Sequence, residues 1–115
     1  MKRGDVYWAD LVPRSGSEPK GRRQMVVVSH DAFNQVEAWR SIIVVPLSTS
    51  KARAQRGPTA IALRKGTAGI NRGSVALCHQ VTTLDRAKLT KRIGTLPKAN
   101  LAEIEAALKA ALDLE

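Results

Sequence analysis

The sequence predicts a mainly β domain of the α+β class, a small barrel or sandwich of short strands with one C-terminal helix. Short segments rich in valine and isoleucine alternate with glycine, proline and polar residues, and the end of the chain carries leucines at helical spacing. A length of 115 residues suits one domain, residues 1–115. With only 2 Trp, 1 Tyr and 1 Phe, the core must be largely aliphatic.

Each expected strand is a short apolar run between turn-forming residues. We expect strands at residues 6–11, 25–29, 42–47, 59–63, 74–81 and 92–96. Pro46 has no N–H, so we expect it to confine the third strand to an edge or a bulge. Residues 84–89 are expected to form a short helix. Loops or turns are expected at residues 13–22, 51–57 and 66–73.

The C-terminal segment has the pattern of an amphipathic helix. Asn100 is expected to cap it, and Glu103 stands at the third position after Asn100, as in a capping box. Leu101, Ile104, Leu108 and Leu112 then fall on one face. The sequence therefore predicts a helix that packs onto the barrel.

The net charge of the chain limits the classes of partner that it is expected to bind. Its 19 Lys and Arg against 10 Asp and Glu give a formal net charge of +9 and an isoelectric point near 10.5. So strong an excess on a small domain favours a polyanionic partner, most commonly nucleic acid. Charge alone does not distinguish DNA, RNA and an acidic protein.

The cysteine and histidine content argues against disulfide and metal chemistry. Cys78 is the only cysteine, so no internal disulfide can form, and the cytoplasm is the expected location. No apolar run approaches the length of a membrane span, so no membrane association is expected. Cys78, His30 and His79 do not have the spacing of metal ligands, and we expect no metal or other cofactor.

Polar side chains at strand ends are the candidates for chemistry. Arg22 and Arg23 precede one strand, Ser48 and Thr49 follow another, and His79 interrupts an apolar run. An arginine fork with a hydroxyl can bind a phosphate and stabilise its transition-state charge. RNA supplies its own nucleophile, the 2′-OH, so proton transfer and charge stabilisation would suffice to cut it. These residue types also occur in surface ion pairs and turns, so the pattern alone does not decide.

The order of four motifs resembles the MazF/PemK/Kid family of toxin endoribonucleases. They are R-G-D-V-Y-W-A-D-L at residues 3–11 with G-S-E at 16–18, G-R-R-Q-M-V-V-V-S at 21–29, V-V-P-L-S-T at 44–49, and G-S-V-A-L-C-H-Q-V-T-T-L-D at 73–85. Each motif is unspecific, but the four together span most of the chain. The resemblance implies an SH3-like small β-barrel with a C-terminal helix.

The resemblance also implies an activity and partners. It implies a homodimer that cuts single-stranded RNA, such as mRNA, at short sequences without metal, and an acidic antitoxin protein that inhibits it. The family's catalytic Arg corresponds to Arg23, its catalytic Thr to Ser48, and its loop Glu to Glu18. Gln24 stands where the family has Pro, and His79 where it has Asp or Glu. Either Arg22 or Arg23 can be the working arginine, Ser48 or Thr49 can bind the phosphate, and His79 is either a base or structural.

The expected RNA contacts are basic and polar residues beside these positions. They are Lys20, Arg22, Thr49, Lys51, Arg53 and Arg56. Two other functions remain open at this point: a CcdB-like toxin that binds gyrase on the same fold, and a nucleic-acid-binding module without catalysis. Discrete cuts in RNA would distinguish the nuclease from both.

Overall fold

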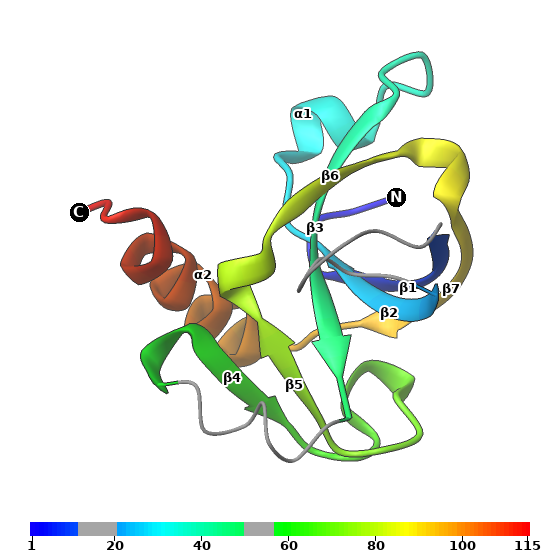
Figure 1. Cartoon of the computed structure of the whole chain (residues 1–115). Coiled ribbons are helices and arrows are strands. Elements are labelled where there is room, and N and C mark those ends of the chain that lie inside the picture. Colours follow the sequence, from blue (N-terminus) through cyan, green and yellow to red (C-terminus); the bar gives the residue numbers. More distant parts are fainter. Residues whose placement is uncertain (12–20, 50–56) are drawn as a thin grey trace.

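The structure is a computed structural model that describes residues 1–11, 21–49 and 57–115. Within these ranges the chain forms seven strands, two α-helices and several single 3-10 turns (Figure 1). The elements are β1 (Asp5–Leu11), β2 (Gly21–Val27), α1 (Asp31–Asn34), β3 (Ser41–Ser48), β4 (Ala60–Leu63), β5 (Ser74–Leu77), β6 (Thr82–Asp85), β7 (Leu89–Thr95) and α2 (Lys98–Leu112).

All strand pairs are antiparallel, in the order β4-β5-β3-β2-β1-β7, and β6 also pairs with β3. β6 and β7 stand at the two edges of the β6-β3-β2-β1-β7 sheet, yet only the 3-10 turn Arg86–Lys88 joins them. The sheet must therefore curl until its edges approach each other, as Figure 1 shows. The predicted fold class, a small mainly β barrel-like fold with a C-terminal helix, is confirmed.

β3 is a central strand, so the edge position predicted from Pro46 is wrong. One side of β3 pairs with β2, where Pro46 lies opposite Met25. On the other side, residues 41–44 pair with β6 and residues 47–48 pair with β5. Pro46 falls in the gap between those two partners. A missing N–H is tolerated there because no ladder bond is required of it on that side.

Strand alternation sorts the core into two clusters on the two faces of β1, β2 and β3. One face carries Val6, Val26 and Val45 and is covered by α2 through Ile104. The other carries Ala9, Met25 and Val44 and faces the inside of the curled sheet. This division decides which way each side chain at the strand ends points.

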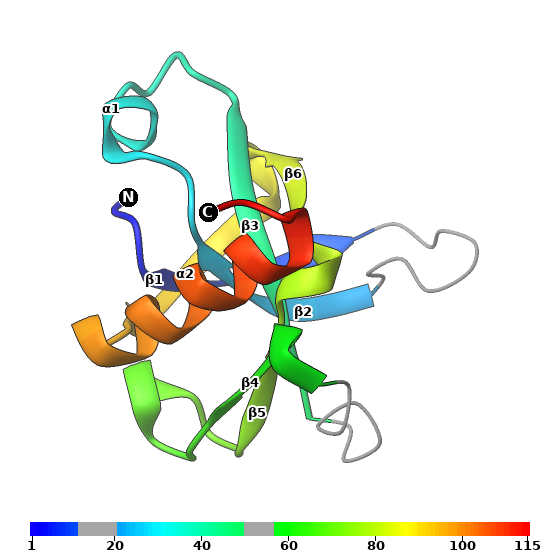
Figure 2. The ribbon, with the colours of Figure 1, turned by 90° about the vertical axis from the view of Figure 1, so that its left-hand side faces the viewer.

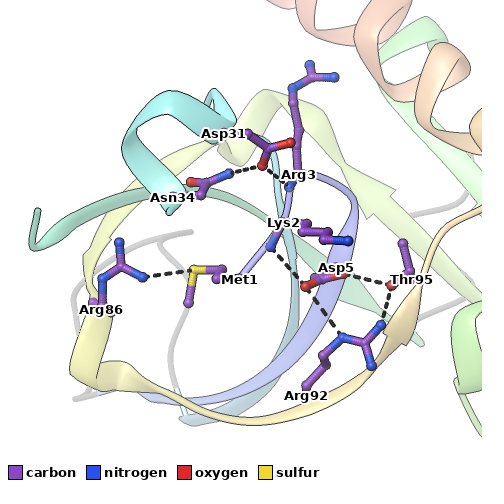
Figure 3. Close-up of polar contacts among 9 residues, drawn as sticks. All are labelled: Met1, Lys2, Arg3, Asp5, Asp31, Asn34, Arg86, Arg92 and Thr95. Carbon is purple, nitrogen blue, oxygen red and sulfur yellow. Dashed lines mark hydrogen bonds and ion pairs between the residues drawn. The ribbon is translucent and has the colours of Figure 1, made fainter. Parts of the chain in front are cut away.

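A buried carboxylate fastens the start of β1 to β7 (Figure 3). Asp5 is 3% exposed and accepts hydrogen bonds from the Lys2 backbone N–H at 3.0 Å and the Thr95 hydroxyl at 2.7 Å. Arg92 Nε lies 3.4 Å from the second carboxylate oxygen. Asp5 of the first motif is therefore a structural residue.

Asp31 fastens the N-terminus to α1 in the same way. Its Oδ1 accepts hydrogen bonds from the Arg3 backbone N–H at 2.7 Å and from Asn34 Nδ2 at 3.0 Å (Figure 3). These bonds favour the charged carboxylate and hold the pKa of Asp31 below its usual value. The Arg3 side chain continues to Glu105 of α2, with 3.2 Å between the charged atoms. Residues before β1 thus connect both helices.

Most predicted strands are present, with shifted ends. β2 begins at Gly21, four residues earlier than expected. The expected strand over residues 74–81 ends at Leu77 and continues as the 3-10 turn Cys78–Gln80, which moves the chain from one half of β3 to the other. The short helix expected at residues 84–89 is wrong. Those residues end β6, form a 3-10 turn capped by Asp85, and begin β7.

The C-terminal helix is confirmed, but its predicted start is wrong. α2 begins at Lys98 with Pro97 as its N-cap, so Asn100 lies inside the first turn. Proline is favoured at helix starts because its fixed φ suits the helix and its missing N–H is not needed there. Ile104 is buried in the core and Leu108 packs against it, whereas Leu112 is 54% exposed. The apolar face is therefore shorter than the leucine spacing suggested.

Candidate functional site

A pocket of about 270 Å³ lies where the ends of three strands meet. β1 contributes Trp8, β2 begins beside it, β3 ends beside it, and the turn before β5 forms its other wall. These strand ends lie on the side of the molecule away from α1 and the N-terminus (Figure 2). The lining residues are Trp8, Arg22, Arg23, Gln24, Leu47, Thr49, Asn71, Arg72 and Ser74.

The pocket is positively charged. Three of its described lining residues are arginines, and no described lining residue is an aspartate or glutamate. Gln24, Asn71 and Thr49 add uncharged donors and acceptors around the arginines. Such a surface attracts phosphate and can also bond the edges of nucleobases.

The two arginines of β2 occupy opposite faces of the sheet. Val26 belongs to the core under α2 and Met25 to the core inside the curl, so alternation assigns Arg22 to the first face and Arg23 to the second. The β2–β3 pairing ends with Met25 opposite Pro46. Arg23 and Ser48 each lie two residues beyond this pair, and Arg22 and Thr49 each lie three residues beyond it, so alternation places each pair on one face. The candidates for the working arginine and for the phosphate-binding hydroxyl therefore form two pairs, Arg23 with Ser48 and Arg22 with Thr49.

The exposure of the two pairs differs. Arg22 and Thr49 are exposed, while Arg23 is half-buried and Ser48 is 3% exposed. Arg23 also borders the pocket, whereas Ser48 is not among its lining residues. The Arg22 and Thr49 pair is open to a large ligand, and the Arg23 and Ser48 pair is more enclosed.

A close backbone contact positions the Asn71–Arg72 wall. The turn Thr67–Gly69 packs against β7, and a Cβ on Gly94 would lie 2.2 Å from the Ala68 carbonyl oxygen. Only a glycine at position 94 allows this approach. The adjoining Ser74 hydroxyl donates a hydrogen bond to the Arg72 carbonyl at 3.0 Å, which ties the wall to β5.

Within one chain, His79 is not brought to the pocket. It lies exposed in the 3-10 turn after β5, which packs against α2. The pocket is at the other end of β5, where Val75 lies opposite Ser48. Two strand residues, Ala76 and Leu77, and one 3-10 residue, Cys78, separate His79 from Val75, roughly 10 Å along the chain.

Five predicted site residues lie outside the described residues: Glu18, Lys20, Lys51, Arg53 and Arg56. Six residues of the pocket were not predicted as site residues from the sequence: Trp8, Gln24, Leu47, Asn71, Arg72 and Ser74. Trp8 reads in sequence as an ordinary strand residue. Asn71 and Arg72 stand in a glycine-rich turn that gives no sign of what it faces.

Among the described residues, no three His, Cys, Asp or Glu side chains gather in a way that could bind a metal ion. Cys78 is fully buried, and burial raises the pKa of its thiol to about 11. In the same part of the chain, no helix is long and apolar enough to span a membrane.

Comparison with known proteins identifies the family. A family model described as a PemK-like, MazF-like toxin of type II toxin–antitoxin systems matches residues 2–112. The endoribonuclease MazF6 of Mycobacterium tuberculosis is 32% identical over 114 residues, which cover 99% of this chain and 98% of the relative.

Two solved structures are similar over nearly the whole fold. MazF from Deinococcus radiodurans has a TM-score of 0.80 at 26% identity and covers 99% of this chain and 97% of its own. A mycobacterial endoribonuclease in complex with its cognate antitoxin has a TM-score of 0.80 at 25% identity, with 100% and 97% covered. This chain therefore belongs to the PemK-like, MazF-like toxin family of type II toxin–antitoxin systems.

Proposed function

We propose that this protein is the toxin of a toxin–antitoxin pair and acts as a metal-independent endoribonuclease on single-stranded RNA. The observation that carries the proposal is the pocket with three arginines at the strand ends, in a chain whose curated relatives are endoribonucleases. A groove rich in arginine and amides suits a phosphodiester chain with unpaired bases.

The proposed reaction uses the nucleophile of the substrate. The 2′-OH attacks the adjacent phosphorus and the bond to the 5′-oxygen breaks, which leaves a 2′,3′-cyclic phosphate and a 5′-OH. Arg23 stabilises the charge that develops on the phosphate, and Ser48, on the same face of the sheet, bonds the scissile phosphate. Arg22 and Thr49, on the other face, bind the RNA chain. Removal of one charge-stabilising donor costs ~10²–10³ in rate.

A single assay tests the activity. The purified protein is incubated with a long single-stranded RNA in EDTA, and the cut ends are mapped. Discrete cuts with 5′-OH ends are expected. Arg23→Ala and Ser48→Ala should lower kcat ~10²–10³-fold, and Arg22→Ala and Thr49→Ala should mainly raise KM. Lys109→Ala, which removes one exposed charge on α2, is the matched control. Intact RNA together with inhibited gyrase would favour a CcdB-like function instead.

Two residues are candidates for the proton acceptor. Glu18 is the carboxylate that the family resemblance supplies. His79 can act only in the pocket of a second copy of the chain, because the pocket of its own chain lies at the far end of β5. We propose that the protein is a homodimer. Whether one subunit supplies His79 to the pocket of the other can be tested directly.

Mixed dimers distinguish the arrangements. If the site combines Arg23 of one subunit with His79 of the other, a mixture of inactive Arg23→Ala and His79→Ala proteins forms dimers with one intact site and recovers activity. If both residues act within one chain, no mixed dimer is active. Full activity of His79→Ala alone removes the histidine from the mechanism and leaves Glu18.

We also propose that the acidic tail of an antitoxin covers the same pocket. The antitoxin complex of a relative and the positive charge of the pocket support this. An acidic peptide should then compete with RNA, and Arg22→Ala should weaken both ligands. Simultaneous binding of the two would contradict a shared site.

A further inference from the structure

Trp8 is an aromatic side chain in a pocket whose other described lining residues are polar or charged, apart from Leu47. The chain has four Phe, Trp and Tyr residues, all within the described ranges, and only Trp8 lines the pocket. Its ring is half-buried, and the Arg22 guanidinium carbon lies 4.4 Å from the ring centroid. One face of the indole is therefore covered by a cation.

The position of Trp8 follows from the strand pattern. Trp8 is on the same face of β1 as Val6, but it lies beyond the core, directly opposite Gln24. Arg22 is opposite Asp10 and is therefore the diagonal neighbour that reaches the ring. Trp8 lies within β1, whereas the long Arg22 side chain stands at the exposed start of β2 and can change rotamer there.

We propose that Trp8 is the stacking platform for one unpaired RNA base, and that Arg22 covers the ring until the base displaces it and then binds a phosphate. The inference deepens the proposed function and rests on it. Stacking a base on an aromatic ring strengthens binding roughly 5- to 150-fold. An exposed cation–π contact contributes only about 2- to 5-fold. A base therefore replaces Arg22 at the ring, and the released guanidinium gains a charge-assisted bond to phosphate.

The surroundings of the ring suit a nucleobase. A volume of about 270 Å³ is near the lower end, ~300 Å³, of sites for drug-sized ligands, so the pocket can admit one flat group such as a nucleobase. Gln24 and Asn71 place amide donors and acceptors in the same pocket, where they can bond the edge of the stacked base. The subsite would therefore contribute to the sequence preference of cleavage.

Binding can be tested without cleavage. In Trp39→Phe protein Trp8 is the only tryptophan, and Trp39 is absent from the pocket lining. Its fluorescence should be quenched by a mixed-sequence single-stranded RNA, and not by the same RNA in a duplex, whose bases are already stacked. Quenching without any cleavage would uphold the platform and refute the proposed nuclease. Cleavage without quenching would refute the platform alone.

Substrates with one abasic nucleotide locate the subsite. One is made for each position around a mapped cut site, and cleavage by the wild type should fall roughly 5- to 150-fold at one position. Trp8→Ala should raise KM by a similar factor and show no further loss at that position, and Trp8→Phe should keep most of the affinity. Trp39→Ala is the control and should cut normally. An abasic penalty that persists unchanged in Trp8→Ala would overturn the inference.

Discussion

Gly94→Ala tests how the far wall of the pocket is held. The added Cβ would lie 2.2 Å from the Ala68 carbonyl oxygen and 2.7 Å from its carbonyl carbon. Carbon and oxygen atoms make contact at roughly 3.3 Å, so the turn and β7 must separate by about 1 Å. Because both partners are backbone, no rotamer change relieves the clash. We expect the upper part of the overpacking range, about 2–3 kcal/mol of lost stability.

Thermal unfolding measures that loss. For a domain of this size 1 kcal/mol corresponds to roughly 4 °C, so Tm should fall by about 8–12 °C. Gly73→Ala is the matched control, since its φ is not positive and the nearest atom to its Cβ is the Leu63 carbonyl oxygen at 3.9 Å. RNA affinity should also fall in Gly94→Ala, because the turn continues into Asn71. Equal Tm values for the two variants would refute the packing argument.

Three further predictions concern single groups. The pKa of Asp31 is lowered in the fold, so its charge stabilises the protein above ~pH 4 and this contribution is lost as pH falls through the folded pKa. Asp31→Asn should thus be less stable than wild type near neutral pH, and urea unfolding should show the difference vanishing in acid; a constant difference would contradict this. With a thiol pKa raised to about 11 by burial, Cys78 should resist iodoacetamide at about pH 8 in the native protein and react once it is unfolded; rapid native labelling would disprove its burial. Arg86 donates hydrogen bonds to three backbone carbonyls of the segment 33–39, so Arg86→Ala should lower the free energy of unfolding in urea by about 1–3 kcal/mol. Arg40→Ala, which removes an exposed ion pair, should lower it by about 1 kcal/mol or less. Equal losses would show that the carbonyl bonds contribute nothing.

Local patterns predicted the parts of the fold in which neighbouring residues decide the structure. The valine-rich runs around Met25 and Val44 are strands, because β-branched side chains suit a pleated, buried surface. Residues 84–89 do not form the expected helix, and their two leucines, Leu84 and Leu89, lie five positions apart, which is not helical spacing. In the structure they are buried in one cluster from two different strands, which spacing along the chain cannot reveal.

In the candidate site, too, local patterns predicted some features and only the tertiary structure decided others. The strand-end arginines and hydroxyls were found from sequence, because residue type and a strand boundary are both local properties. Their separation into two faces was not, since it depends on which of the cores each strand face covers. His79 was expected beside these residues, but a 3-10 turn leaves it at the other end of β5.

The sequence by itself determined the fold class, the positive charge, the family and the identity of the basic residues at the strand ends, because each depends on residue type and order. The tertiary structure alone decided that Trp8, Asn71 and Arg72 share a pocket with Arg22. Trp8 and Asn71 are more than sixty positions apart, and the curl of the sheet and the contact at Gly94 bring their segments together. Sequence patterns report which face a residue occupies, whereas the pairing of distant strands determines what that face meets.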